Sequence, residues 1–196
     1  MFKYLLFTLL YFSLQNHSYG QVKGSSLELS TKSYLEATQS KDWKTVLEMM
    51  NPKIFNFAPK AMLEQMYRQM ENDAGMKFVF SEIEIMGIKS EYSLADTSYI
   101  PVDYSMTILV HINPNLYKNP EDIKVIHQGF EKTYAGQEVI YDPINSRFSI
   151  DIKNTLIASS AQNSNRWYFS EYKANDPILN FILPEEVMNR LLVGWN

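Results

Sequence analysis

The sequence predicts an α+β domain: N-terminal helices packed on a strongly curved, cone-like antiparallel sheet, an inserted helix near 120–135, and C-terminal helices. Three observations predict this class. Apolar residues recur at helical spacing before residue 72 and alternate with polar ones after it. The run Asn-Pro-Glu-Asp at 119–122 is typical of a helix start inside the strand region. Pro177 and Pro184 each follow the last predicted strand and open short helical segments.

The N-terminal helices are predicted from their start and stop signals. Ser30 and Thr31 can cap a first helix. A second helix is expected from Trp43 to the residues before Pro52, because a residue that precedes proline leaves the helical region. Pro59 suits the first position of a third helix.

The strands are predicted from alternation. Residues 77–89 and 99–111 alternate apolar and polar side chains, which is typical of half-buried antiparallel strands. Pro101 cannot donate to a ladder, so we expect an edge or a bulge there. Two hairpins follow, over 139–152 and 155–172. The residues expected on one buried face of the 99–111 strand are Ile100, Val102, Tyr104, Met106, Ile108 and Val110.

Residues 1–20 have the layout of a cleavable secretory signal peptide. Lys3 gives a positive start, residues 5–14 form an apolar run too short to span a bilayer, and small residues precede the predicted cleavage between Gly20 and Gln21. No cysteine follows Gly20, so a lipid anchor is not expected. The predicted location is secreted or periplasmic, which assumes a bacterial source.

Residues 21–196 are expected to form one domain with no transmembrane anchor after cleavage, because charges interrupt every later apolar run. The chain has no cysteine, which excludes disulfides, thiol catalysis and cysteine–metal sites. Its formal net charge of −4, with scattered basic residues, gives no footprint for nucleic acid. No cofactor or metal is expected, because the sequence has no P-loop, no dinucleotide glycine fingerprint and no HExxH.

One segment resembles a known family. Tyr34-Leu35-Glu36-Ala37, the break at Ser40-x-Asp42, and Trp43-x-x-Val46-Leu47, followed by Met50-x-Pro52 and Phe55, are similar to the opening of the nuclear transport factor 2-like (cystatin-like) superfamily. The likeness covers residues 30–70, with a looser match of element order to residue 172. It implies helices lying across the concave face of a bent antiparallel sheet.

The resemblance implies a fold more than a function. Members of that superfamily include isomerases, dehydratases, binding proteins and assembly modules, and a fold does not choose among them. The isomerase branch uses an Asp base opposite a Tyr and a second acid. Asp103 and Tyr104 are adjacent on a strand and should point to opposite faces, which argues against a simple transfer of that chemistry.

Methionine is the most distinctive component of the sequence, since six of the ten fall between Met49 and Met76. Methionine fills irregular gaps and lines adaptable binding surfaces. An apolar pocket is therefore one hypothesis, and an ordinary core is the other. The expected ligand-binding residues are Met50, Met62, Met66, Tyr104 and Met106.

Two pairs of polar residues are candidates for catalytic or metal sites. Glu82 and Glu84 share one strand face, and His127 and Glu131 are one helical turn apart. Each pair is better explained as a solvated surface.

The leading expectation is an exported, non-enzymatic module that binds a small apolar ligand or a protein partner. One alternative is an isomerase, dehydratase or hydrolase that uses an Asp or Glu in the cone cavity. The other is a structural protein that forms a homodimer through its sheet face.

Overall fold

The computed structural model describes residues 26–173 and 176–195. Over this part of the chain the fold is α+β, with helices before, within and after an open antiparallel sheet, as predicted. The predicted signal peptide and its cleavage site between Gly20 and Gln21 lie outside the described residues. None of the described helices combines the length and apolarity that crossing a bilayer requires.

The helices and strands follow one another along the chain in the predicted order. The helices are the segment over residues 26–40, α2 (Trp43–Met49), the 3₁₀ helix η1 (Pro52–Asn56), α3 (Lys60–Glu71), α4 (Pro120–Thr133), α5 (Leu179–Ile182) and α6 (Glu185–Val193). The strands are β1 (Met76–Ile88), β2 (Tyr92–Leu94), β3 (Thr97–Ile112), β4 (Glu138–Asp142), β5 (Arg147–Ala161) and β6 (Tyr168–Tyr172).

The first helix extends further than its predicted caps allow. Ser30 and Thr31 lie inside it, and the Thr31 hydroxyl donates to the Leu27 carbonyl one turn earlier at 2.9 Å. The prediction that these two residues cap the helix is therefore wrong. The cap of α2 is Asp42, whose carboxylate accepts from the backbone N–H of Thr45 at 3.2 Å and from its hydroxyl at 2.6 Å.

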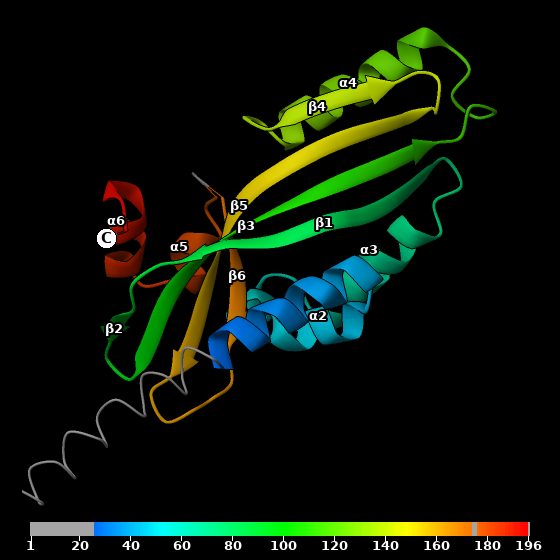
Figure 1. The fold of residues 1–196 in the computed structure, drawn as a ribbon. Helices are drawn as coiled ribbons and strands as arrows, with labels where there is room; N and C mark the ends of the chain where they lie inside the picture. Colours follow the sequence, from blue (N-terminus) through cyan, green and yellow to red (C-terminus); the bar gives the residue numbers. More distant parts are fainter. Residues whose placement is uncertain (1–25, 174–175, 196) are drawn as a thin grey trace, which may run out of the picture.

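β3 and β5 are the long central strands of the sheet, and they run side by side across the whole molecule (Figure 1). The strand order is β1-β3-β5-β4, while β2 also pairs with β3 and β6 also pairs with β5. The prediction of two separate strands, broken near residues 153–154, is wrong. β5 is continuous because it contains no glycine or proline, and each of its residues faces a partner in β3.

Pro101 was expected at an edge or a bulge, but β3 is flanked on both sides. On one side its pairing with β1 ends at Val102, and its pairing with β2 begins at Tyr99. Pro101 lies between these two ladders, where its carbonyl accepts from the Lys89 N–H at 2.9 Å. A residue without an N–H is tolerated at such a junction.

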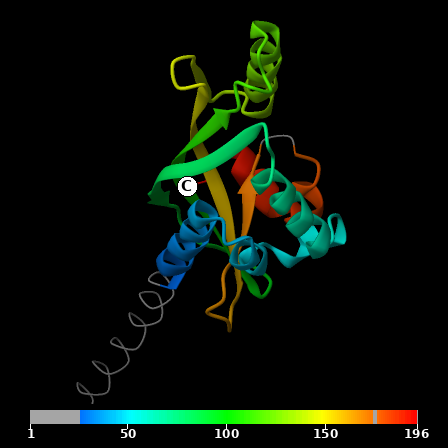
Figure 2. The ribbon, with the colours of Figure 1, turned by 90° about the vertical axis from the view of Figure 1, so that its right-hand side faces the viewer.

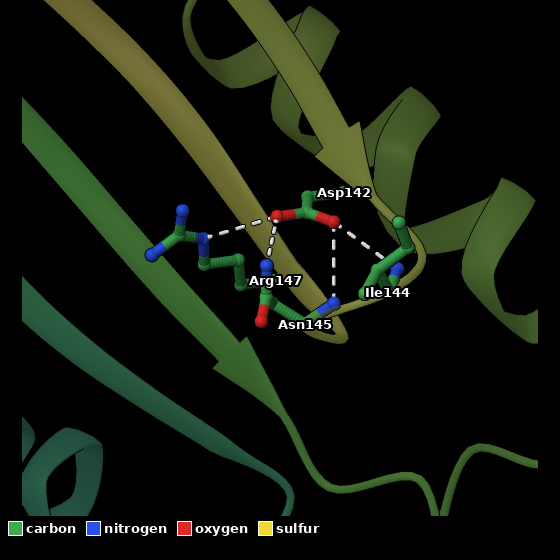
Figure 3. A network of polar contacts seen from close by, with 4 residues as sticks. All are labelled: Asp142, Ile144, Asn145 and Arg147. Atoms are coloured by element: carbon green, nitrogen blue, oxygen red, sulfur yellow. Dashed lines mark hydrogen bonds and ion pairs between the residues drawn. The ribbon is translucent and has the colours of Figure 1, made fainter.

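The β4–β5 hairpin turns at residues 143–146, and Asp142, the last residue of β4, organises the turn (Figure 3). One carboxylate oxygen accepts from the N–H groups of Ile144 and Asn145 at 3.1 and 3.2 Å. The other accepts from the Asn145 side chain at 2.6 Å and lies 3.5 Å from Arg147 Nε. The side-chain hydrogen bond from Asn145, together with the backbone N–H bonds and the nearby arginine, lowers the pKa of Asp142.

The two faces of the sheet differ in character. We call the face that carries Tyr104 and Asn154 the inner face, and the face that carries Asp103 and Thr155 the outer face. On the inner face, helix 26–40 covers one end of the β3–β5 pair and α4 covers the other end. Figure 2 shows α4 and the N-terminal helices at opposite ends of the sheet.

Within the described part of the chain, helices cover the outer face only near β2, where α5 and α6 pack on Tyr99 and Ile157. Further along, most of its side chains are polar, as the alternation predicts, although Val79, Leu109 and Ile140 also lie on it. Asp103 accepts from the Thr155 hydroxyl at 2.7 Å and pairs with Lys89 at 2.9 Å. The inner face is therefore the one that can hold a site enclosed by helices.

Candidate functional site

A cavity of about 660 Å³ opens on the inner face, between the N-terminal helices and the C-terminal end of α4. Ligand sites of proteins occupy roughly 300–1,000 Å³, so this cavity is large enough for a small organic molecule. Much of its wall is apolar. The apolar residues that line it include Trp43, Phe80, Met106, Ile108, Ile152 and Leu156.

Strand register brings three polar side chains onto this apolar face. Tyr104 on β3 lies directly opposite Asn154 on β5. Leu156, two residues further along β5, lies opposite Glu171 on β6. Side chains at alternate positions of one strand share a face, so Tyr104, Asn154 and Glu171 all point into the same cavity.

Glu171 is the centre of this polar group. Its Oε1 accepts a hydrogen bond from the Tyr104 hydroxyl at 2.9 Å and another from the Asn154 side-chain amide at 2.7 Å. Tyr104 is almost fully buried, whereas the Glu171 side chain is exposed at the cavity opening. The carboxylate is therefore held in place by two donors and remains accessible from the cavity.

Three further tyrosines line the same cavity from three different helices. Tyr34 comes from helix 26–40, Tyr67 from α3, and Tyr134 from the C-terminal end of α4. The Tyr34 ring also packs on Phe169 with 4.9 Å between centroids. Four phenols from four elements of the fold therefore line the same cavity as the Glu171 carboxylate.

The pKa values of these tyrosines are all raised. For Tyr34 and Tyr104, burial is the largest cause, and the negative charge of Glu171 comes next. The same two causes, in the same order, raise the pKa of Tyr67 and Tyr134. The phenols therefore stay protonated and neutral at physiological pH, where they act as hydrogen-bond donors and as polarised rings.

Trp43 closes one side of the cavity. Its ring stacks on Tyr67 with 4.3 Å between centroids and 9° between planes, and it meets the edge of Phe80 at 6.1 Å. The Trp43 indole nitrogen is buried and has no hydrogen-bond partner among the described residues. Trp43 and Trp167 are both buried.

Two further charged residues line the cavity beside β6. Lys173 reaches the Thr133 carbonyl at the end of α4 at 3.5 Å, and Asp176 accepts from the Ile178 N–H at 2.9 Å. Lys173 and Asp176 thus form hydrogen bonds with backbone groups, whereas Glu171 forms hydrogen bonds with side chains that line the same cavity. Among the described residues, no cluster of three His, Asp or Glu side chains could hold a metal ion.

The structure brings two of the five predicted ligand-binding residues to this cavity, Tyr104 and Met106. Met50, Met62 and Met66 are not part of its lining. Met50 packs with Trp43 beside the cavity, while Met62 and Met66 are 48% and 54% exposed.

The orientation of α3 explains why Met62 and Met66 miss the cavity. The helix turns Tyr67 and Met70, which are three positions apart, toward the cavity and the core. Residues four apart on a helix are offset by about 40°, so Met66 and then Met62 are rotated progressively away from Met70 toward solvent. Of the three methionines on α3, Met70 therefore reaches the cavity, whereas Met62 and Met66 do not.

Sequence reasoning missed Glu171, Asn154, Tyr34, Tyr67 and Tyr134 as site residues. For Asn154 and Glu171, the sequence contains a pattern that could have indicated the site. Asn154 continues the parity of the buried residues in β5, and Glu171 shares the parity of Phe169. A polar residue in phase with buried neighbours indicates an enclosed polar site.

Of the two candidate pairs, the glutamates are exposed, whereas in the second pair His127 is half-buried and its ring packs on Phe148. Glu82 and Glu84 are exposed, and Glu82 accepts from the Thr107 hydroxyl at 3.1 Å on the outer face. His127 and Glu131 lie 3.8 Å apart on α4. Neither pair contributes to the cavity.

In comparisons with protein-family models, with curated proteins and with solved structures, no match to this chain was found. The resemblance to the nuclear transport factor 2-like superfamily therefore stays a prediction. The site has to be interpreted from its own chemistry.

Proposed function

We propose that this chain is an exported binding protein that holds a small organic molecule in the inner-face cavity. The observation that carries the proposal is the convergence of Tyr104, Asn154 and Glu171 in a cavity of about 660 Å³ whose wall is mostly apolar or aromatic. Binding sites combine such a wall with a few precisely placed polar groups that orient the ligand.

The polar groups refine the expected ligand. A wall of methionines alone would favour a wholly apolar molecule. The tyrosine hydroxyls and the Glu171 carboxylate instead favour a molecule with an apolar body and at least one polar end, because burying them against hydrocarbon would leave hydrogen-bonding groups unsatisfied.

An acid–base enzyme is the second candidate, and the hydrogen bond between Tyr104 and Glu171 is the observation that favours it. A carboxylate and a phenol in contact are suitable groups for proton transfer. The Glu171 carboxylate, however, is exposed at the cavity opening rather than enclosed. We therefore favour binding without catalysis.

A homodimer or a protein partner at the sheet face stays a prediction. The uncovered part of the outer face carries Asp103, Thr107 and Asp151, which hydrogen-bond within the sheet rather than forming an apolar patch. Size-exclusion chromatography with light scattering tests it. A monomer at high protein concentration would argue against pairing through this face.

The binding proposal is tested with the neutral fluorescent probe N-phenyl-1-naphthylamine and a variant that fills the cavity. Met106 lines the cavity, whereas Met86 is 58% exposed and does not line it. We expect the probe to bind the wild-type chain and Met86→Trp alike, and to lose most of its affinity for Met106→Trp. Equal binding to both variants, or none to the wild type, would contradict the proposal.

The export part of the proposal has its own test. The full chain is expressed in a bacterial host, and the N-terminus of the protein recovered outside the cytoplasm is sequenced. We expect it to begin at Gln21. Recovery of an uncleaved chain in the cytoplasm would contradict export.

A further inference from the structure

The chemistry of the cavity distinguishes among classes of polar ligand. The Glu171 carboxylate uses Oε1 to accept both of its hydrogen bonds, from Tyr104 and from Asn154. No hydrogen bond between described residues uses its other oxygen. A carboxylate oxygen is an acceptor only, so its natural complement on a ligand is a donor, and most strongly a cationic one.

The aromatic residues around the carboxylate provide a second feature. The rings of Tyr34, Tyr67, Tyr104 and Tyr134 come from four elements of the fold and line one cavity, together with the Trp43 ring stacked on Tyr67. The faces of aromatic rings carry partial negative charge and attract cations, including ammonium groups that have lost their water. Aromatic walls combined with a carboxylate form a site of negative potential.

The hydroxyl groups of the tyrosines do not oppose the binding of a cation. No hydrogen bond between described residues uses the hydroxyls of Tyr34, Tyr67 or Tyr134. The charge of Glu171 helps to raise the pKa of each, so these phenols remain neutral. Their oxygens can then accept hydrogen bonds from the same ammonium group that contacts the carboxylate.

We propose that the cavity binds an organic monocation, a molecule with an apolar body and a terminal ammonium group, and that Glu171 anchors the ammonium. This inference rests on the proposed binding function and narrows its ligand class. Met106, Ile152 and Leu156 contact the apolar body, while Glu171 and the surrounding tyrosine rings contact the cationic end.

The other charged groups of the cavity are compatible with a cation. Lys173 is directed to the Thr133 carbonyl at the end of α4, and Asp176 adds a second negative charge to the lining. Glu171, Lys173 and Asp176 together give the lining one net negative charge. An anionic ligand would meet Glu171 without a free cationic partner at the centre of the site, so we expect anions to be disfavoured.

The test uses three probes with one apolar body: 4-phenylbutylamine, 4-phenylbutanol and 4-phenylbutyrate. Their affinities for the purified chain are measured by isothermal titration calorimetry at neutral pH. We expect the amine to bind about tenfold tighter than the alcohol, which corresponds to one charge-assisted hydrogen bond at a partly exposed site. The carboxylate should bind more weakly than the alcohol.

Glu171→Gln identifies the anchor. Glutamine keeps an oxygen that can accept from Tyr104 and Asn154, so the local structure should persist, and an unchanged melting temperature checks this. We expect the amine to lose its advantage over the alcohol, while the alcohol affinity stays within about twofold. Glu84→Gln, an exposed glutamate outside the cavity, is the matched control and should behave as wild type.

The outcomes separate this inference from the proposed function. If amine and alcohol bind equally to the wild type, or if Glu171→Gln keeps the preference, the cation inference is wrong and binding in the cavity still stands. If the neutral naphthylamine probe and all three phenylbutyl probes fail to bind, both proposals are wrong.

Discussion

The inner face of the β3–β5 pair contains two contrasting regions, formed by the same strands. Under α4, the face is filled by Val110, Ile112, Phe148 and Ile150, all nearly inaccessible. A few residues along, it carries Tyr104 and Asn154, which line a cavity together with Glu171 of β6. One continuous alternation of side chains can therefore form both a packed core and a polar site, and the two regions differ only in their side-chain types.

The largest expected difference between the two regions is in stability. Phe148 is completely buried, and its ring meets Phe130 and Tyr141, with centroids 5.2 and 4.6 Å away. We expect Phe148→Ala to lower the free energy of unfolding by about 3–5 kcal/mol, because it leaves a void in a filled core. Met106→Ala, at the cavity wall, should lower it by about 1 kcal/mol or less, because the removed atoms border space that already exists.

Urea denaturation of the two variants and the wild type measures this difference. If Met106→Ala is as destabilising as Phe148→Ala, the cavity region is packed as tightly as the region under α4. The proposed difference in packing between the two regions would then be wrong.

The tyrosines of the cavity region should make stability sensitive to alkaline pH. Burial raises the pKa of Tyr34 and Tyr104 above the ordinary value of 10.0. Their contribution is therefore complete below pH 10 and is lost as the pH rises above it, because only the unfolded chain ionises readily there. Above pH 10 each group should cost about 1.4 kcal/mol per pH unit until its folded-state pKa is reached.

The free energy of unfolding is measured by urea denaturation between pH 8 and pH 11, with Tyr104→Phe as the comparison. Phenylalanine has no hydroxyl to ionise, so the variant should lose less stability per pH unit than the wild type. Parallel curves for the two proteins would count against buried, neutral Tyr104.

Converting the polar region into core is a sharper way to test the comparison. Asn154→Leu continues the apolar series of β5, so we expect stability to change by no more than about 1 kcal/mol, with an increase favoured. The affinity for the neutral naphthylamine probe should persist, while the preference for 4-phenylbutylamine over 4-phenylbutanol should fall, because Glu171 loses one of the two donors that orient it.

Asn189→Leu, on the exposed surface of α6, is the control for adding a leucine. A large loss of stability in Asn154→Leu but not in Asn189→Leu would mean that Asn154 supports the fold itself. The polar region would then be structural rather than a site.

The smallest expected effect is at the exposed β4–β5 turn beyond the filled region (Figure 3). Asp142→Ala removes the acceptor for Ile144 and Asn145, so hydrogen exchange should become faster in residues 142–147 and stay unchanged in the centre of β5. The pKa of Asp142 is lowered in the folded state, so its contribution is present above the unfolded-state pKa and is lost as the pH falls through the folded-state value. Asp142→Ala should therefore lessen the loss of stability in acid, and exchange that remains slow throughout the turn would contradict this role.

Most of the fold could be predicted because its signals are local. Start and stop residues placed α2, α3 and α4, and alternation placed β1 and β3. The continuity of β5 could not be predicted in the same way. Its Lys153-Asn154 doublet resembles a break between strands, whereas a 15-residue pairing with β3 decides the conformation.

The candidate site was harder to predict for a related reason. Tyr104 and Met106 were identified through the parity of one strand, but Tyr34, Tyr67 and Tyr134 reach the cavity from separate helices. Only packing brings those helices together, and no local pattern records it. Asn154 shows how the two errors are connected, because the residue interpreted as a break between strands is the one that marks the site.

The uninterrupted ladder between β3 and β5 limits how this protein can change over evolution. Deleting or inserting one residue between Phe148 and Asn154 would shift the parity of the strand, so Asn154 would point outward and the core residues beyond the change would follow it. The cavity residues and the core residues of β5 therefore depend on the same alternation of inward and outward side chains. Homologues should diversify their ligands by substitution at positions such as 104, 154 and 171, and they should accept changes of length only in the turns.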